Sequence, residues 1–428
     1  MSDFIKPLKV AVISDSQAYP TLADWGMGNL DKALSFLSGM KPDVLLMAGD
    51  LADGTMYDVY DVYRSLLEKY FSSSMPVHIG CAGNHDFWTP KGVERIPENI
   101  YREMCARIGQ KHADPLHEVV GGYDFIALSD RADEKLDYSD EKLAELEVEI
   151  QKSIARAPDK PVFVVTHFNP FGTVTGSNSG SASKKLRALF NRYPQVFSLS
   201  GHSHCPLEDE RCIWQGEFTA INTSSLAYAC TEDRCYNMCS VIVPFAREAL
   251  HVLMLDVYPD RVDIHRYNVE DRREIKPDKL WRVAVPYRPE DAVYTARRKE
   301  LRKAPEFAPD ARGVIRYDFG YLYLIFDPAQ HEDFTHFYKV KVFERSADGT
   351  WQLIAEERYI SDFYRLAGIA GRQQVYKLPS EKIKGGSFCR VEVYPVETFG
   401  NEGKPLIVER KIPGASKFKE GTTLCPQE

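Results

Sequence analysis

Five clusters of polar residues stand directly after apolar, strand-like runs in the first half of this 428-residue chain. They combine carboxylates, an amide and imidazoles, and they are Asp15-Ser16-Gln17, Gly49-Asp50-Leu51-Ala52-Asp53, Gly83-Asn84-His85-Asp86, Thr166-His167 and Gly201-His202-Ser203-His204. A mixed shell of oxygen and nitrogen donors suits Mn, Fe, Zn or Co better than Ca or a thiolate site. Two metal ions about 3.5–4 Å apart can hold a hydroxide and clamp the oxygens of a phosphoryl group. The clusters therefore indicate a two-metal site suited to phosphoryl chemistry.

The elements that must carry these clusters to one point are predicted by hydrophobic periodicity. Five apolar runs predict buried strands, and three amphipathic segments predict helices. The strands cover 9–15, 43–50, 76–86, 161–170 and 194–204, and the helices cover 30–40, 57–72 and 139–157. Strands that alternate with helices predict an α/β layered sheet. Functional groups in such sheets collect at the carboxyl ends of the strands, where all five clusters stand.

In order and spacing, the clusters resemble the signature of the calcineurin-like metallophosphoesterase family, which is D-x-H, GD-x-x-D, GNH[DE], a lone His and GH-x-H. Each motif alone is weak, but the combination is specific and covers about residues 8–270. The resemblance implies a four-layer α/β/β/α sandwich. It also implies a metal-dependent hydrolase of phosphomonoesters or phosphodiesters that acts through a metal-activated hydroxide. Two metal ions would be bound, with Mn as the first expectation and Fe, Zn, Mg or Co as alternatives.

The resemblance implies ligands for two metals that share one bridging carboxylate. The first set is Asp15, Asp50 and His204, and the second set is Asp50, Asn84, His167 and His202. The implied catalytic pair is His85 with Asp86. His85 would meet the phosphate or protonate the leaving oxygen without binding metal, and Asp86 would orient it. Asp53 would hold the loop or a ligand.

One position departs from the family pattern, because the sequence has Gln17 where D-x-H places a histidine. A glutamine offers a neutral carbonyl oxygen, which is a harder and weaker donor than imidazole. Gln17 could bind the first metal and favour Mn or Mg, hydrogen-bond a metal-bound water, or leave the first site weak and the enzyme with one metal. We expect Gln17 to be a ligand or close to one, because every other member of the set is present.

Each cluster taken alone also has a purely structural explanation. Asp15 suits a turn at a strand end, Asn84 suits a left-handed turn, and His85 alone would be an ordinary surface or core histidine. The metal-site interpretation depends on the set, because chance placement of all five clusters at strand ends in this order is improbable.

Two further features lie near the clusters in sequence. Residues 171–183 are dense in Gly and Ser, which predicts a mobile surface loop, with a lid over the substrate as the functional alternative. Four aromatic residues could stack on a substrate, with core packing as the alternative, and these are Trp25, Tyr57, Phe87 and Trp88.

Charge and composition limit the partners. The formal net charge of -8 argues against duplex nucleic acid or an anionic membrane, which require a basic face. We expect a small phosphorylated substrate instead. No apolar run reaches about 18 residues, so no membrane span is predicted. The first residues do not resemble a signal peptide, so we expect a cytoplasmic protein unless an upstream export signal was removed. The cluster Cys230, Cys235 and Cys239 predicts reduced thiols, with a zinc site or a Cys230–Cys235 disulfide as alternatives.

The second half of the chain differs from the first in its composition and in its predicted secondary structure. We predict a catalytic domain over 1–275, a charged and proline-rich linker over 276–310, a small all-β sandwich over 311–413 and a polar tail over 414–428. The run SFCRVEVYPVETFGNEGKPL weakly resembles the last strands of a fibronectin type III domain. Such a domain could form a homodimer. The alternative function is a scaffold with a decayed metal site, in which this domain mediates binding.

Overall fold

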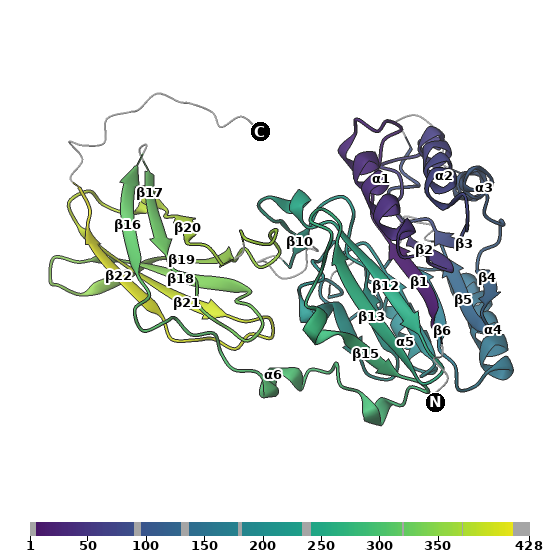
Figure 1. Cartoon of the computed structure of the whole chain (residues 1–428). Coiled ribbons are helices and arrows are strands. Elements are labelled where there is room, and N and C mark those ends of the chain that lie inside the picture. The colour runs from purple at the N-terminus through teal and green to yellow at the C-terminus, as the bar shows by residue number, and fades with distance from the viewer. Residues whose placement is uncertain are drawn as a thin grey trace. The chain divides into compact units, whose positions relative to one another are not determined.

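The chain folds into two units, Met1–Thr295 and Ala296–Glu428 (Figure 1). The computed structural model describes residues 6–89, 96–129, 137–178, 182–232, 241–318, 321–369 and 371–413. The predicted tail over 414–428 lies outside these residues. No helix within the described ranges is long and apolar enough to cross a membrane.

The first sheet of the first unit is built on three parallel strands with a continuous apolar character. They are β1 (Leu8–Ile13), β2 (Val44–Ala48) and β3 (Val77–Cys81). The strand order is β14-β13-β12-β1-β2-β3, with β15 beside β13. The added strands run antiparallel to their neighbours, and they are β12 (His251–Val257), β13 (Arg261–Asn268), β14 (Arg273–Glu274) and β15 (Trp281–Ala284).

The second sheet has the order β4-β5-β6-β7-β9-β8, with a parallel centre and antiparallel edges. Its strands are β4 (Leu116–Val120), β5 (Tyr123–Leu128), β6 (Val162–Thr166), β7 (Val196–Ser200), β8 (Ile213–Gln215) and β9 (Thr219–Asn222). A short two-stranded ladder joins β10 (Cys230–Thr231) to β11 (Val241–Ile242).

Three apolar clusters define four layers. Alternate side chains of each strand point to opposite faces, so Val10 and Val12 enter the core between the two sheets while Ala11 and Ile13 face the helices. One outer layer contains α1 (Trp25–Ser38), α2 (Tyr57–Phe71) and α3 (Pro97–Ile108). The other outer layer contains α4 (Asp140–Arg156) and α5 (Lys184–Phe190). The predicted α/β/β/α sandwich is therefore confirmed.

Several elements differ from the sequence prediction. Helix α1 begins at Trp25 because Asp24 caps it, with its side chain accepting from the backbone N–H groups of Gly26 and Met27. Strand β9 ends at Asn222, and a loop over residues 223–229 follows it. The predicted linker at 276–310 is partly sheet, since β15 pairs with β13 and Trp281 is buried.

The second unit is an antiparallel β-sandwich. One sheet has the order β16-β17-β20 and the other β19-β18-β21-β22, and their inner faces share one apolar core. The strands are β16 (Gly313–Asp318), β17 (Tyr321–Phe326), β18 (Phe337–Arg345), β19 (Trp351–Ile360), β20 (Gln374–Lys377), β21 (Phe388–Val396) and β22 (Leu406–Lys411). A four-residue helix, α6 (Arg298–Leu301), precedes them. The predicted all-β sandwich is confirmed, and its resemblance to fibronectin type III stays a prediction.

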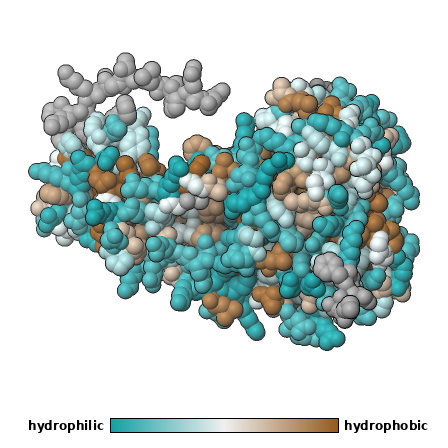
Figure 2. Space-filling model, in the orientation of Figure 1, coloured by the Kyte–Doolittle hydropathy of each residue, from teal (hydrophilic) through white to brown (hydrophobic). Residues whose placement is uncertain are grey.

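Surface hydropathy is mixed on the face that Figure 2 shows, where hydrophobic residues form small patches among hydrophilic ones. Isolated exposed apolar residues such as Leu22, Ile242 and Leu301 are ordinary in folded proteins.

Candidate metal centre

The five polar clusters lie in loops that follow β1, β2, β3, β6 and β7. These loops leave the carboxyl ends of parallel strands, and the two sheets that carry them face each other across a shared core. Chemical groups far apart in sequence therefore meet at one end of the sandwich. Most of the predicted ligands are buried there, among them Asp15, Gln17, Asp50, His167 and His204.

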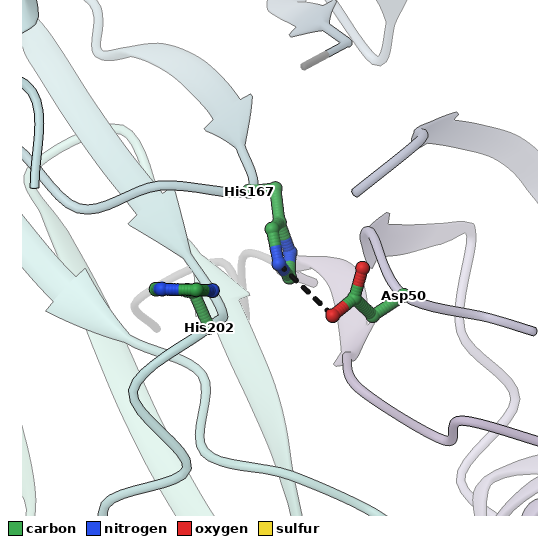
Figure 3. Close-up of side chains that lie close together, drawn as sticks. All are labelled: Asp50, His167 and His202. Carbon is green, nitrogen blue, oxygen red and sulfur yellow. Dashed lines mark ion pairs between the residues drawn. The ribbon is translucent and has the colours of Figure 1, made fainter. Parts of the chain in front are cut away.

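The structure brings Asp50, His167 and His202 together, with one ligand atom from each within 4.8 Å of the others (Figure 3). His167 Nε2 lies 3.2 Å from Asp50 Oδ2 and 3.0 Å from Asn84 Oδ1. In Figure 3 the His167 ring points at the carboxylate, and the His202 ring lies beside them. Four of the predicted ligands thus converge on one point.

The protonation pattern of His167 suits a bound cation. Its Nδ1 lies 2.9 Å from the carbonyl oxygen of Ala48, which can only accept, so Nδ1 carries the hydrogen. Nε2 faces the oxygens of Asp50 and Asn84 and forms an ion pair with Asp50 Oδ2, which is buried. Burial lowers the pKa of His167, but the charge of Asp50 outweighs it and raises this pKa to about 10. A cation that replaced the proton on Nε2 would bind the same nitrogen and oxygens, so the donor set fits a metal ion.

A second histidine–carboxylate pair repeats this arrangement. His204 Nδ1 donates to the carbonyl oxygen of Tyr228 at 3.1 Å, and His204 Nε2 lies 3.0 Å from Asp15 Oδ1. Asp15 is fully buried, and it accepts from the Ser14 hydroxyl and from the backbone N–H of His202 at 3.1 Å. Both histidines are therefore held through Nδ1 by a backbone carbonyl while Nε2 faces a buried carboxylate.

The electrostatic environment favours the metal-binding protonation states of Asp50 and His202. Burial opposes the charge on Asp50, but His167, His85 and His202 outweigh it and hold the pKa of Asp50 well below its usual range. Burial lowers the pKa of His202 to about 3, and repulsion from His167 adds to this effect. An ionised carboxylate and a neutral imidazole are the forms that bind metal ions.

Several residues of the site have a strained, left-handed backbone conformation, and hydrogen bonds between the loops hold it in place. Five residues other than glycine have left-handed φ angles, namely Asp15 (51°), Gln17 (43°), Asp50 (53°), His202 (67°) and His204 (52°). Such conformations cost roughly 1–2 kcal/mol each and cluster at functional sites. Hydrogen bonds from Asp15 N to Gly49 O and from Gln17 N to Asp50 O, both 3.0 Å, hold the first two loops together.

Two glycines of the motifs lie so close to buried carboxylates that no side chain would fit there. A Cβ atom at Gly83 would collide with Asp50 Oδ1, and one at Gly201 would collide with Asp15 Oδ2. These glycines let the backbone approach the two buried acids, so they belong to the construction of the site.

The comparisons with known proteins agree with this geometry. Residues 8–206 match the model of the calcineurin-like phosphoesterase family. This part of the chain belongs to that family. The match covers the loops of all five clusters, and the family implies a dinuclear metal centre. A search of curated proteins finds no match.

Similarity to solved structures is remote. A purple acid phosphatase from yellow lupin (Lupinus luteus) seeds is 13% identical with a TM-score of 0.45, covering 64% of this chain and 53% of that one. GAP50, the anchor in the inner membrane complex of Plasmodium, is 13% identical with a TM-score of 0.43, covering 66% and 90%. A 5′-nucleotidase precursor from Thermus thermophilus is 13% identical with a TM-score of 0.34, covering 67% and 55%. The chain thus spans about half the length of the lupin enzyme.

One predicted contact of the candidate site is wrong. His85 is oriented by Asp53 and not by Asp86, since His85 Nδ1 lies 2.7 Å from Asp53 Oδ1. Asp86 points away and accepts from the backbone N–H of Ala52 at 3.0 Å and of Gly83 at 2.9 Å. Burial raises the pKa of Asp86 to about 6, and the charge of Asp50 adds to the effect. The side chains of His85 and Asp86 have different partners, so their adjacency in the sequence did not predict a contact between them.

The residue that departs from the D-x-H pattern lies near an aromatic side chain. Gln17 is buried, and the hydroxyl of Tyr228 lies close to it. Burial raises the pKa of Tyr228 to about 12, and the proximity of Gln17 opposes the rise. Sequence analysis missed Tyr228, which stands 24 positions after His204 and outside every motif. That Gln17 binds metal stays a prediction.

Aromatic residues border the site on the His85 side. The ring of Trp88 lies 3.6 Å from that of His85, centroid to centroid, and Trp88 is half exposed. The hydroxyl of Tyr19 donates to Asp53 Oδ2 at 3.0 Å. Phe87 is fully buried, so its role is core packing. Trp88 is thus placed where it could touch a substrate, and Tyr19 is a neighbour that the sequence did not reveal.

Two other predictions concern segments around the site. Residues 171–178 form a packed turn and not an open loop, because Val174 and Ser177 are buried and Thr175 N donates to Arg211 O at 3.0 Å. Residues 179–181 lie outside the described part. Cys230 is buried, while Cys235 and Cys239 lie outside the described part, so the predicted thiol cluster stays untested.

Proposed function

We propose that the first unit is a metal-dependent phosphoester hydrolase with a two-metal centre, acting on small phosphorylated compounds. The observation that carries the proposal is the convergence of Asp50, His167 and His202, which place one ligand atom each within 4.8 Å of the others. Membership of the phosphoesterase family supports it. Asp15, Gln17, Asp50 and His204 would hold one ion, and Asp50, Asn84, His167 and His202 the other. When bound, the ions supply positive charge that acidifies water and neutralises phosphoryl oxygens.

The chain's own contribution to the chemistry centres on His85. Asp53 accepts the hydrogen on His85 Nδ1, so the opposite nitrogen, Nε2, faces the centre and lies 3.9 Å from Asp50 Oδ2. From there Nε2 can donate a proton to the leaving oxygen of an ester held against the centre. The ring of Trp88, tilted by 37° with its centroid 3.6 Å from that of His85, limits rotation of His85.

We propose Mn as the working metal. A glutamine oxygen in place of an imidazole makes the donor set of one ion harder, which favours Mn or Mg over Zn.

The test combines metal analysis with paired substrates. We would quantify bound metals and assay the full chain with Mn, Mg, Zn, Fe and Co against an aryl phosphomonoester and an aryl phosphodiester. His85→Ala is expected to lower kcat by about 10²–10⁴ while its metal content stays unchanged. Asp53→Asn should lower kcat by a smaller factor, because His85 remains but loses its orientation.

A matched control is His112→Ala, since His112 is a surface histidine paired with Glu98. It should leave both metal content and turnover unchanged. Loss of metal in His85→Ala would contradict its role as a proton donor. Absence of turnover in a wild-type protein that binds little metal would overturn the proposal and favour a scaffold function of the second unit.

A further inference from the structure

Tyr19 is joined to His85 through a single carboxylate. The Tyr19 hydroxyl donates to Asp53 Oδ2 at 3.0 Å, and the other oxygen of that carboxylate, Oδ1, lies 2.7 Å from His85 Nδ1. An ionised carboxylate can only accept hydrogen bonds, so Asp53 takes one hydrogen from each neighbour on opposite oxygens. The three side chains, here called the Tyr19 triad, therefore form one continuous hydrogen-bonded series.

The members of the Tyr19 triad come from the ends of three neighbouring strands. Tyr19 follows β1, Asp53 follows β2 and His85 follows β3. These strands are parallel and adjacent in the first sheet, so their loops leave the sheet side by side. The triad thus crosses the same edge of the sheet at which the candidate ligands stand.

Backbone hydrogen bonds hold the first two loops of the triad in register. Ala18 N donates to Leu51 O at 2.9 Å, and Asp53 N donates to Ala18 O at 3.2 Å. Tyr19 N donates to a side-chain oxygen of Asp24 at 3.2 Å, and the same oxygen caps helix α1. The backbone that carries Tyr19 is therefore tied both to the Asp53 loop and to a helix.

The Tyr19 triad runs from the surface inwards. Tyr19 is 41% exposed, whereas the side chains of Asp53 and His85 are 29% and 16% exposed. A partly exposed carboxylate bound only by His85 would be free to rotate and to take up water. The Tyr19 hydroxyl occupies Oδ2 and so fixes the plane of the Asp53 carboxylate, which keeps Oδ1 opposite His85 Nδ1.

We propose that Tyr19 is a positioning residue for His85. Its hydroxyl fixes the Asp53 carboxylate, and this carboxylate holds the imidazole with Nε2 towards the leaving oxygen of the ester. The inference depends on the proposed hydrolase function and adds to it a residue that stands outside all five clusters. The effect of Tyr19 should grow with the need of the leaving oxygen for a proton, because a stable leaving anion departs without one.

The first experiment varies the leaving group and removes only the hydroxyl. Tyr19→Phe and the wild-type full chain would be assayed with Mn²⁺ on a 4-nitrophenyl ester, which leaves as a stable anion, and on the corresponding ethyl ester, which does not. In Tyr19→Phe kcat should fall about tenfold on the ethyl ester and about twofold or less on the 4-nitrophenyl ester. KM and metal content should stay unchanged.

The matched control is Tyr193→Phe, because the Tyr193 hydroxyl also donates to a carboxylate, that of Glu147 on α4. It should alter neither rate. Equal losses on both esters in Tyr19→Phe would show a general structural role and overturn the proposal, and so would an absence of any loss. In an Asp53→Asn background, Tyr19→Phe should have no further effect, and a further loss there would show that Tyr19 does not act through Asp53.

A measurement without turnover separates this inference from the proposed function. In the metal-free full chain with ¹⁵N-labelled histidine, the hydrogen on His85 Nδ1 should give a downfield proton resonance that His85→Ala removes. Tyr19→Phe should move it upfield, because a rotating Asp53 carboxylate binds this hydrogen less closely, and Tyr193→Phe should not. An unmoved resonance, or one moved further downfield, would overturn the positioning role. Failure of the proposed function would instead appear as an absence of metal-dependent turnover in the wild type.

Discussion

The candidate centre has two halves. In each half a backbone carbonyl holds a histidine ring whose other nitrogen faces a buried carboxylate, but the carbonyl and the carboxylate come from different residues. In one half, here called the His167 half, a backbone carbonyl at Ala48 fixes the ring and Nε2 faces Asp50. In the other, the His204 half, the carbonyl of Tyr228 fixes the ring and Nε2 faces Asp15. Holding each ring through Nδ1 leaves Nε2 as the nitrogen that a cation would bind in both halves.

The halves differ in how completely they are built. The His167 half has two imidazoles and an amide around a shared carboxylate, and all of them match the family signature. The His204 half has one imidazole, and its other donors are the carboxylate of Asp15 and the neutral amide of Gln17. We expect the weaker donor at position 17 to lower the affinity of one ion and to leave that of the other unchanged.

The largest effect should come from removing what the halves share. Asp50→Asn keeps the size of the side chain but removes its charge, so both ions should lose affinity and kcat/KM should fall on the order of 10³-fold. Metal content by mass spectrometry and turnover of an aryl phosphate would measure this. The control is Asp61→Asn on the surface of α2, where Asp61 pairs with Arg107. Full retention of one ion by Asp50→Asn would mean that the halves do not share this carboxylate.

The next prediction separates the halves. His167→Ala and His204→Ala should each leave one ion, but the ion that remains in His204→Ala should bind more tightly. The reason is that His204→Ala leaves a half with two imidazoles, His167 and His202, whereas His167→Ala leaves a half whose only imidazole is His204. Mn²⁺ calorimetry on the two variants gives the order directly. The reverse order would show that Gln17 is a stronger ligand than its chemistry suggests.

How far the sequence predicted these halves depends on the kind of residue. The candidate ligands follow buried strands directly, so strand ends and a known motif order were enough to place them at one end of the two sheets. The partner of His85 was missed because Asp53 comes from a different strand end and Asp86, its sequence neighbour, turns into the structure. Tyr228 carries no spacing signal, since it reaches the centre through a loop after β9.

The sequence predicted the long elements of the fold, which have a clear hydrophobic period, and missed the short ones. Strongly apolar strands such as β2 and amphipathic helices such as α4 gave clear periodic patterns. Short elements such as α5 did not, because seven residues are too few to show a period. Trp281 was assigned to a linker because charged residues and prolines dominate the sequence around it. In the structure its ring is buried, and its strand, β15, pairs with β13.

A third prediction concerns the scaffold behind the His204 half. Glu210 accepts from Trp281 Nε1 at 2.8 Å and pairs with the buried Arg266 at 3.0 Å. Arg266 also donates to Leu207 O, which anchors the segment that follows His204. Burial opposes the charge on Glu210, but Arg266 and Lys276 outweigh it and lower its pKa to about 2.

The sign of the pH effect follows from this lowered pKa. Glu210 contributes stability above its unfolded pKa of 4.5, and the contribution, about 3 kcal/mol, is lost as pH falls from there towards 2. Urea unfolding of the first unit at pH 7 and at pH 3 would measure it. Glu210→Gln should be less stable at pH 7, because Arg266 loses its partner, and should lose less stability between the two pH values than the wild type. Equal losses in both proteins would exclude this role.

The smallest effect should come from restoring the family residue in the weaker half. Gln17→His introduces an imidazole where the pattern expects one, and histidine tolerates the left-handed φ of 43° better than most residues do. The affinity for the weaker Mn²⁺ ion should rise about tenfold, which is about 1.4 kcal/mol, and the tighter ion should be unaffected. Zn²⁺ should gain more than Mn²⁺, because the new donor is softer than an amide oxygen. If neither metal gains, Gln17 lies outside the coordination shell, and the difference between the halves comes from Asp15 and His204 alone.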